Sequence, residues 1–193
     1  MAYAMLSRLS IQSTSDQTHY ELYPSISTMA GSAVTPEQAA VWSYPHYEAD
    51  EEEAVFNMVN AMLGRVHQSG FLNQLPKTNF ERVKEGIACY KSIRQEIKNA
   101  LPRFPLGLIA FDAPWAAAAL DCKTHWYLSV WRKDGVNSVQ EIPLVVPEGK
   151  TVKVECIYPQ GLPILYEYDE TKTSLVVTLE EKFRARLFKV EWI

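Results

Sequence analysis

The sequence predicts an α/β part followed by an all-β part. Helical periodicity dominates between Thr18 and Leu101, where apolar residues recur every three or four positions. After Pro105 this signal gives way to short segments rich in Val, Ile, Leu, Tyr and Trp, which turn residues separate. A chain of 193 residues forms one ordinary domain or two small ones, so we expect roughly 100 residues of α/β structure and roughly 90 of β structure.

Three short apolar segments in the α/β part are candidate strands. They cover residues 9–13, 32–34 and 39–42, and the last two flank the insert Pro36-Glu37-Gln38. Alternation of such strands with helices is typical of a parallel βα repeat.

The first strong helix signal follows Asp50. This residue can cap a helix, and the next three glutamates lie where the helix dipole favours negative charge. The helical spacing then places six apolar side chains on one face: Val55, Met58, Val59, Met62, Leu63 and Val66. We therefore predict a helix that ends before Gly70, with His67 near its end.

A second helix is predicted over residues 79–100. Thr78 and Glu81 have the spacing of a capping box at its start. Pro102 and Pro105 prevent it from continuing.

The remaining chain predicts an antiparallel β-sandwich. The candidate strands are residues 126–131, 151–157, 163–168, 174–179 and 185–192, and the turn signals include Asp134-Gly135, Glu148-Gly149 and Gln160-Gly161. We expect the large aromatic residues of this part to lie in its core: Trp115, Trp126 and Trp131.

Composition excludes several classes of protein. A chain with 47% hydrophobic and 22% charged residues can bury a core, and a net charge of −4 argues against a general nucleic-acid binder. No apolar run is long enough to span a membrane, and residues 1–10 do not resemble a secretion signal, which favours the cytoplasm. The dispersed histidines and cysteines form no metal-ligand pattern, so we expect buried, reduced thiols at Cys89, Cys122 and Cys156 and no metal or other cofactor.

The segment Ser13-Thr14-Ser15-Asp16-Gln17 contains the clearest candidate for a functional group. A carboxylate between a strand and a helix lies at the end of a βα unit where active sites are built. The alternative is that Asp16 caps the following helix, a role that Ser15 or Thr18 could share.

Six ordered motifs extend this observation. They are LSIQSTSDQ at residues 9–17, PEQAAVWSYP at 36–45, FNMVNAML at 56–63, VKEGIACYKSIR at 83–94, LPRFPLG at 101–107 and WYLSVWR at 126–132. Together they resemble glycoside hydrolase family 36, the α-galactosidases or melibiases, over residues 9–159.

This resemblance implies that the chain corresponds to the C-terminal part of such an enzyme. Residues 1–104 would form the sixth to eighth βα units of a (β/α)8 TIM barrel, and residues 105–193 the family's C-terminal antiparallel β domain. Asp16 would be the general acid/base that acts on terminal α-D-galactosyl groups of oligosaccharides. The family uses no cofactor, and its members are often homo-oligomers.

The resemblance also implies a missing group. Retaining glycosidases need a second carboxylate about 5–5.5 Å from the first, as nucleophile. The family's nucleophile lies in a Lys-Trp-Asp-like motif, and a Cys- and Gly-rich segment contributes to its sugar site; the sequence contains neither. We therefore expect no α-galactosidase activity from this chain alone, and a non-catalytic carbohydrate-binding or interaction fragment is the alternative.

Three further residues are candidates for substrate binding. Glu37 could reach the mouth of the barrel, and the alternative is that it organises its loop or caps a helix. Trp42 and the neighbouring Tyr44 could stack on a sugar face, or they could pack between barrel helices.

Overall fold

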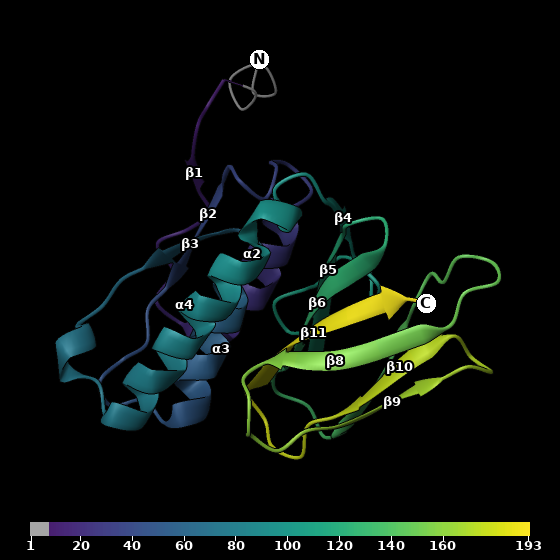
Figure 1. Ribbon diagram of the computed structural model, residues 1–193. Helices are drawn as coiled ribbons and strands as arrows, with labels where there is room; N and C mark the ends of the chain where they lie inside the picture. Colours follow the sequence, from purple (N-terminus) through teal and green to yellow (C-terminus); the bar gives the residue numbers. More distant parts are fainter. Residues whose placement is uncertain (1–7) are drawn as a thin grey trace.

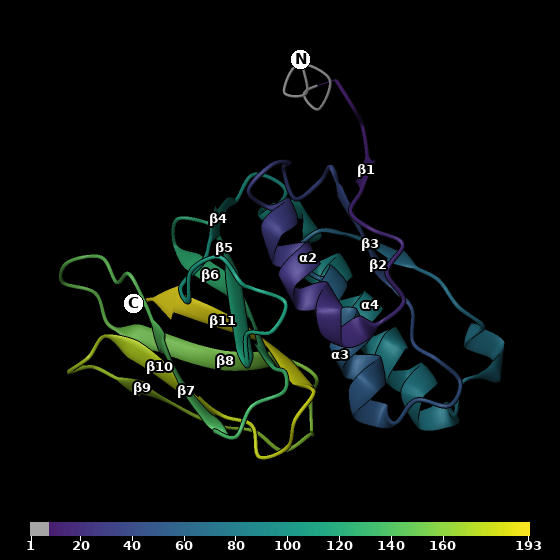
Figure 2. The ribbon, with the colours of Figure 1, turned by 180° about the vertical axis from the view of Figure 1, so that it is seen from behind.

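A computed structural model describes residues 8–193 as four layers. Both views show a small parallel sheet, a layer of helices, and then the two sheets of the β part (Figure 1, Figure 2). Residues 1–7 lie outside the described part. They belong to the N-terminal segment that does not resemble a secretion signal.

The α/β part contains strands that alternate with helices. The strands are β1 (Gln12–Ser13), β2 (Ala39–Ser43) and β3 (Arg65–Gln68), which pair in parallel in the order β1-β2-β3. The helices are α2 (Tyr23–Ala30), α3 (Glu51–Ala61) and α4 (Lys77–Ile97), and short 3-10 turns lie at Tyr20–Leu22 and Leu72–Gln74. The predicted βα repeat is confirmed, as an open three-stranded sheet within the described residues.

The predicted strand at residues 32–34 is wrong. These residues form a turn at the end of α2, in which the Val34 amide donates to the Ala30 carbonyl at 3.0 Å. A helix was expected after Asp16, but the bounds of α2 were not predicted, because its sequence YPSISTMA mixes polar and β-branched residues without a strong apolar stripe.

The predicted end of the first long helix is also wrong. Asp50 caps it as expected, since its carboxylate accepts the Glu53 amide at 2.7 Å. However, α3 ends at Ala61, and Val66 and His67 belong to β3. The cause is close packing at Gly64, where an added Cβ would lie 2.8 Å from the Ala39 carbonyl oxygen. Only a glycine lets the chain turn this tightly against β2.

The capping box predicted for the second helix does not form. Helix α4 begins at Lys77 with Pro76 at the N-cap, while Thr78 donates to Asn79 and Glu81 pairs with Lys84. The helix ends at Ile97, because the chain enters the first strand of the β part soon afterwards.

The predicted antiparallel sandwich is confirmed. A five-stranded sheet has the order β4-β5-β6-β11-β8, and a three-stranded sheet has the order β7-β10-β9 (Figure 1). The strands of the larger sheet are β4 (Leu101–Arg103), β5 (Trp115–Asp121), β6 (His125–Arg132), β8 (Val152–Tyr158) and β11 (Arg184–Trp192). Those of the smaller sheet are β7 (Val139–Pro143), β9 (Leu165–Asp169) and β10 (Ser174–Thr178).

The five-stranded sheet is buried on both faces. One face packs against α3 and α4 through a cluster that includes Val59, Ile93, Tyr127 and Trp131. The other face packs against the three-stranded sheet and includes Trp115 and Trp126. The three tryptophans are therefore core residues, as predicted, and the α/β and β parts share one hydrophobic core.

Candidate functional site

A hollow of about 220 Å³ lies at the C-terminal ends of the parallel strands. The chain emerges from all three strands at this edge, because β1, β2 and β3 run in the same direction. Polar and aromatic residues from the three connections line the hollow: Asp16, Gln17, Thr18, Tyr23, Trp42, Tyr44 and Ser69. Ligand sites of open α/β sheets form at such an edge.

Asp16 is exposed and is three residues beyond β1. It does not occupy an N-cap position, since His19 and Leu22 lie at those positions of the next two helical segments. The amides of Thr18 and His19 are instead satisfied by Gln17, whose Oε1 accepts them at 2.9 and 3.0 Å. The alternative in which Asp16 caps a helix is therefore wrong, and its carboxylate is available to a ligand in the hollow.

Tyr23 fixes the backbone next to Asp16. Its phenol donates to the Ser15 carbonyl at 2.6 Å, although the side chain is otherwise buried at the start of α2. Burial raises the pKa of the Tyr23 phenol. A hydrogen bond with Thr14 lowers this pKa, and the negative charge of Asp16 raises it. Tyr23 is thus a neutral hydrogen-bond donor whose pKa is affected by the nearby Asp16 carboxylate.

Trp42 lies on the face of the sheet opposite to the helices. The next residue on β2, Ser43, donates to the Met58 sulfur of α3 at 3.2 Å, so side chains one position earlier point the other way. The Trp42 indole donates to Ser13 Oγ at 3.2 Å and meets the His67 ring edge-on, with centroids 5.3 Å apart. These contacts hold the ring beside the hollow, and Trp42 also packs against a small core cluster that includes Tyr23 and Ala61.

An aromatic run continues outward from the hollow. Tyr44 and Tyr47 are 37% and 46% exposed. The His46 ring lies between them, with ring centroids 6.3 Å from Tyr44 and 5.3 Å from Tyr47. Exposed rings of this kind offer flat apolar faces with polar edges.

Glu37 lies at the other end of the sheet. It precedes β2 and borders a separate hollow of about 470 Å³ that basic residues line, among them Arg65, Arg94 and Lys98. The structure therefore brings Asp16 and Trp42 together and does not bring Glu37 to them.

Several residues of the hollow were not anticipated from the sequence. Tyr23 belongs to the helix expected after Asp16, whose bounds were not predicted, and Ser69 follows a strand that was assigned to a helix. Gln17 stood next to Asp16 in the motif, but its role in the turn depends on the fold.

Neither a metal site nor a membrane-spanning helix is found among the described residues. Within residues 8–193, no group of three His, Cys, Asp or Glu side chains could hold a metal ion, and no helix is long and apolar enough to span a membrane. The three thiols are free and half-buried. Burial raises the pKa of Cys89 to about 12 and those of Cys122 and Cys156 to about 11, so all three are protonated at neutral pH.

Solved structures of α-galactosidases contain a part with the same fold. A variant of the GH36 α-galactosidase AgaA from Geobacillus stearothermophilus, in complex with 1-deoxygalactonojirimycin, matches 93% of this chain with a TM-score of 0.71 at 12% identity. The galactosidase domain of the α-galactosidase–sucrose kinase AgaSK matches the same share, with a TM-score of 0.67 at 15% identity. The α-galactosidase from Lactobacillus brevis gives 0.67 at 14% identity.

The chain has the fold of one part of a GH36 α-galactosidase. It spans 25% of the first two proteins and 26% of the third, which is consistent with the C-terminal part that the motifs indicated. The resemblance found in the sequence is confirmed at the level of the fold. No protein-family model matches the sequence, and no curated protein matches it significantly.

Proposed function

We propose that this chain is the part of a retaining α-galactosidase that carries the general acid/base, Asp16. The observation that supports it most is the position of this carboxylate, which lies three residues after β1 and lines a hollow at the C-terminal edge of the parallel sheet. As acid it would protonate the glycosidic oxygen, and as base it would then deprotonate the water that releases the sugar.

The proposed substrates are oligosaccharides with terminal α-D-galactosyl groups. AgaA variants, which have the same fold, have been solved in complex with raffinose and with stachyose. In this chain, Gln17, Ser69 and Tyr44 would offer hydrogen bonds to sugar hydroxyls, and Trp42 an apolar face.

We propose that the chain by itself does not hydrolyse these substrates. Retention requires two carboxylates about 5–5.5 Å apart. Among the described residues that line the hollow, Asp16 is the one carboxylate. A nucleophile would have to come from polypeptide that this sequence does not contain.

The domain organisation belongs to the same proposal. Residues 1–104 would contain the sixth to eighth βα units of a TIM barrel, and residues 105–193 would form the C-terminal β domain, whose larger sheet also takes in β4 at the end of the first segment. The order β1-β2-β3 supports this, because neighbouring barrel strands are consecutive in the sequence. Association into homo-oligomers, as in the resembling family, is part of the same hypothesis.

An aryl α-galactoside tests the activity of the chain. The purified chain should release no aryl alcohol above the rate in buffer. The aspartate of a full-length GH36 α-galactosidase that superposes on Asp16 should, when replaced by Asn, lose several orders of magnitude in kcat. Turnover by the chain alone would contradict the missing nucleophile, and an unaffected relative would contradict the role of Asp16.

A non-catalytic carbohydrate-binding fragment is the second candidate. The exposed rings of Tyr44 and Tyr47 favour it, because they could stack on sugars without any catalytic carboxylate. Binding of an α-galactoside that survives Asp16→Asn but not Tyr44→Ala would support this function over the first.

A further inference from the structure

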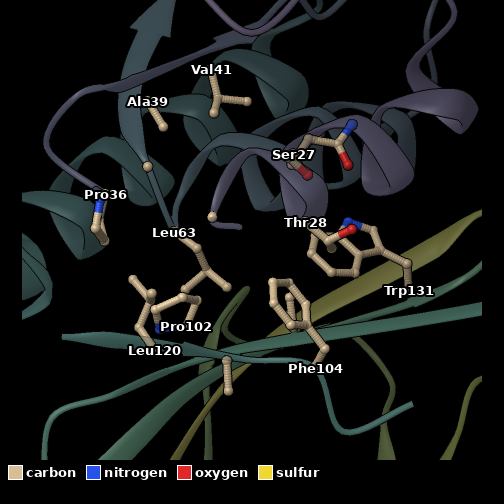
Figure 3. A pocket seen from close by; sticks show the side chains of 15 residues that line it. Ser27, Thr28, Pro36, Ala39, Val41, Leu63, Pro102, Phe104, Leu120 and Trp131 are labelled. Carbon is tan, nitrogen blue, oxygen red and sulfur yellow. The ribbon is translucent and has the colours of Figure 1, made fainter. Parts of the chain in front are cut away.

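A small cavity lies between the helical layer and the five-stranded sheet. Its volume is about 30 Å³, and residues of α2, β2, α3, β5 and β6 contribute to its wall. Figure 3 shows the cavity with Ser27, Thr28 and Trp131 on one side and Leu63, Pro102 and Leu120 on another. One side of the wall therefore carries polar groups, whereas the rest is apolar.

Two buried polar atoms belong to this wall and have no hydrogen-bond partner among the described residues. They are the Asn60 Oδ1 acceptor on α3 and the Trp131 Nε1 donor on β6. The two residues are only 2% and 1% exposed, so bulk solvent does not reach them. The Asn60 amide nitrogen is already used, since it donates to the Tyr20 carbonyl at 3.1 Å and so holds the side chain in place.

Thr28 supplies a third polar group. Its hydroxyl is buried in α2 and donates to the Ser25 carbonyl at 3.2 Å. The proton of this hydroxyl is therefore engaged, whereas its oxygen can still accept a hydrogen bond.

We propose that this cavity is a binding site for one structural water molecule. A space of about 10–15 Å³ on this measure is enough for a water, and a buried water makes about three hydrogen bonds. The water would accept from the Trp131 indole and donate to Asn60 Oδ1 and Thr28 Oγ1. These groups come from β6, α3 and α2, so one water would join the helical layer to the β part.

The position of the site matters for the candidate functional hollow. Ala39 and Val41 of β2 also line the cavity, and Trp42, which lines the hollow, lies on the opposite face of the same strand. The water would thus lie on the helix-facing side of β2, the strand whose other face carries Trp42.

Nuclear magnetic resonance on the unmodified chain tests the proposal. The Trp131 indole proton should give a cross-peak to water in 15N-edited NOESY and ROESY spectra, with the sign of a long-lived bound water. The Trp115 indole is the control, because Trp115 is also a buried residue but its indole donates to the Asn137 carbonyl at 3.2 Å. A Trp131 signal without a water cross-peak would overturn the proposal.

A variant assigns the partner of the water. In a folded Asn60→Leu chain, which has a side chain of similar size, the Trp131 cross-peak should weaken at least severalfold. An unchanged cross-peak would overturn the bridge to Asn60. Xenon is a further probe, since its entry into the cavity of the unmodified chain would show a dry apolar space and contradict a water site.

Discussion

Arg186 on β11 forms a paired hydrogen bond with Glu52 on α3, with both N···O distances at 2.7 Å. The arginine side chain is 1% exposed, and its guanidinium also donates to the carbonyls of Ala185 and Pro163. The two residues lie 134 positions apart in the sequence, and they connect the α/β part to the sandwich beside the shared core.

Removing one member of this pair should destabilise the whole chain. Glu52→Gln leaves the Arg186 charge buried without its counter-ion, so we expect a loss of about 3–5 kcal/mol in the free energy of unfolding. Urea denaturation followed by circular dichroism measures it. Glu181→Gln is the control, because the Glu181 side chain is 71% exposed and its pair with Arg184 should contribute less than about 1 kcal/mol. Equal effects of the two variants would contradict this assignment.

The cap of α3 makes a smaller contribution. Asp50→Ala removes the acceptor of the Glu53 amide and should cost about 1 kcal/mol. Asp50→Ser, which retains a capping oxygen, should restore most of the stability. Denaturant midpoints that do not distinguish Ala from Ser would show that this cap is unimportant.

The ion pair between Arg103 and Asp121, at the junction of the α/β and β parts, should make the stability of the fold depend on pH. Burial disfavours ionisation of Asp121, but hydrogen bonds from Arg103 and from the Lys123 amide outweigh it and lower the pKa of this carboxyl. The unfolded carboxyl titrates near a pKa of about 3.9, so the stabilisation is present above that pH and is lost as the pH falls through the folded pKa.

The variant Arg103→Met should therefore cost about 1 kcal/mol at pH 7 and progressively less below about pH 4. Unfolding measured at both pH values gives the comparison. Lys84→Met, which removes an exposed pair with Glu81, is the control and should change stability little at either pH. An Arg103 effect that stays constant down to pH 2 would be inconsistent with this pKa shift.

The three half-buried thiols should react slowly in the folded chain. With a pKa of about 12, the Cys89 thiolate fraction at pH 8 is roughly three orders of magnitude below that of a free cysteine. Iodoacetamide labelling followed by mass spectrometry should show slow modification of all three cysteines and normal rates in guanidinium chloride. Rapid labelling of Cys89 under native conditions would reveal local opening between α4 and β8.

The elements that could be predicted from the sequence are those whose local residue pattern matches the structure that they adopt. The strands of the sandwich alternate or carry β-branched and aromatic residues, and the Asp50 cap is local, so both could be found without tertiary information. Asp16 could be found in the same way, because a carboxylate between a strand and a helix is a pattern along the chain.

The errors arise where tertiary packing overrides a local pattern. Strand β5 was not among the predicted strands, because it contains four consecutive alanines, which have low strand propensity. Both of its faces are nevertheless buried, and the small side chains let α2 approach. Val66 fits the stripe of α3 because it packs against the same core, and only the contact of Gly64 with β2 reveals that the helix has ended. The other residues of the hollow come close to Asp16 only because the three strands pair into one sheet. No local sequence pattern encodes this pairing.

Binding of an α-galactoside to the chain tests the central claim most directly. Raffinose and sucrose form a matched pair of ligands, since they differ by the terminal α-galactosyl group. Titration of the 15N-labelled chain with raffinose should shift the Trp42 indole and the amides of Gln17 and Ser69, whereas sucrose should leave them unchanged. Identical responses to the two sugars, or raffinose shifts confined to residues far from Asp16, would contradict a galactoside site in this hollow.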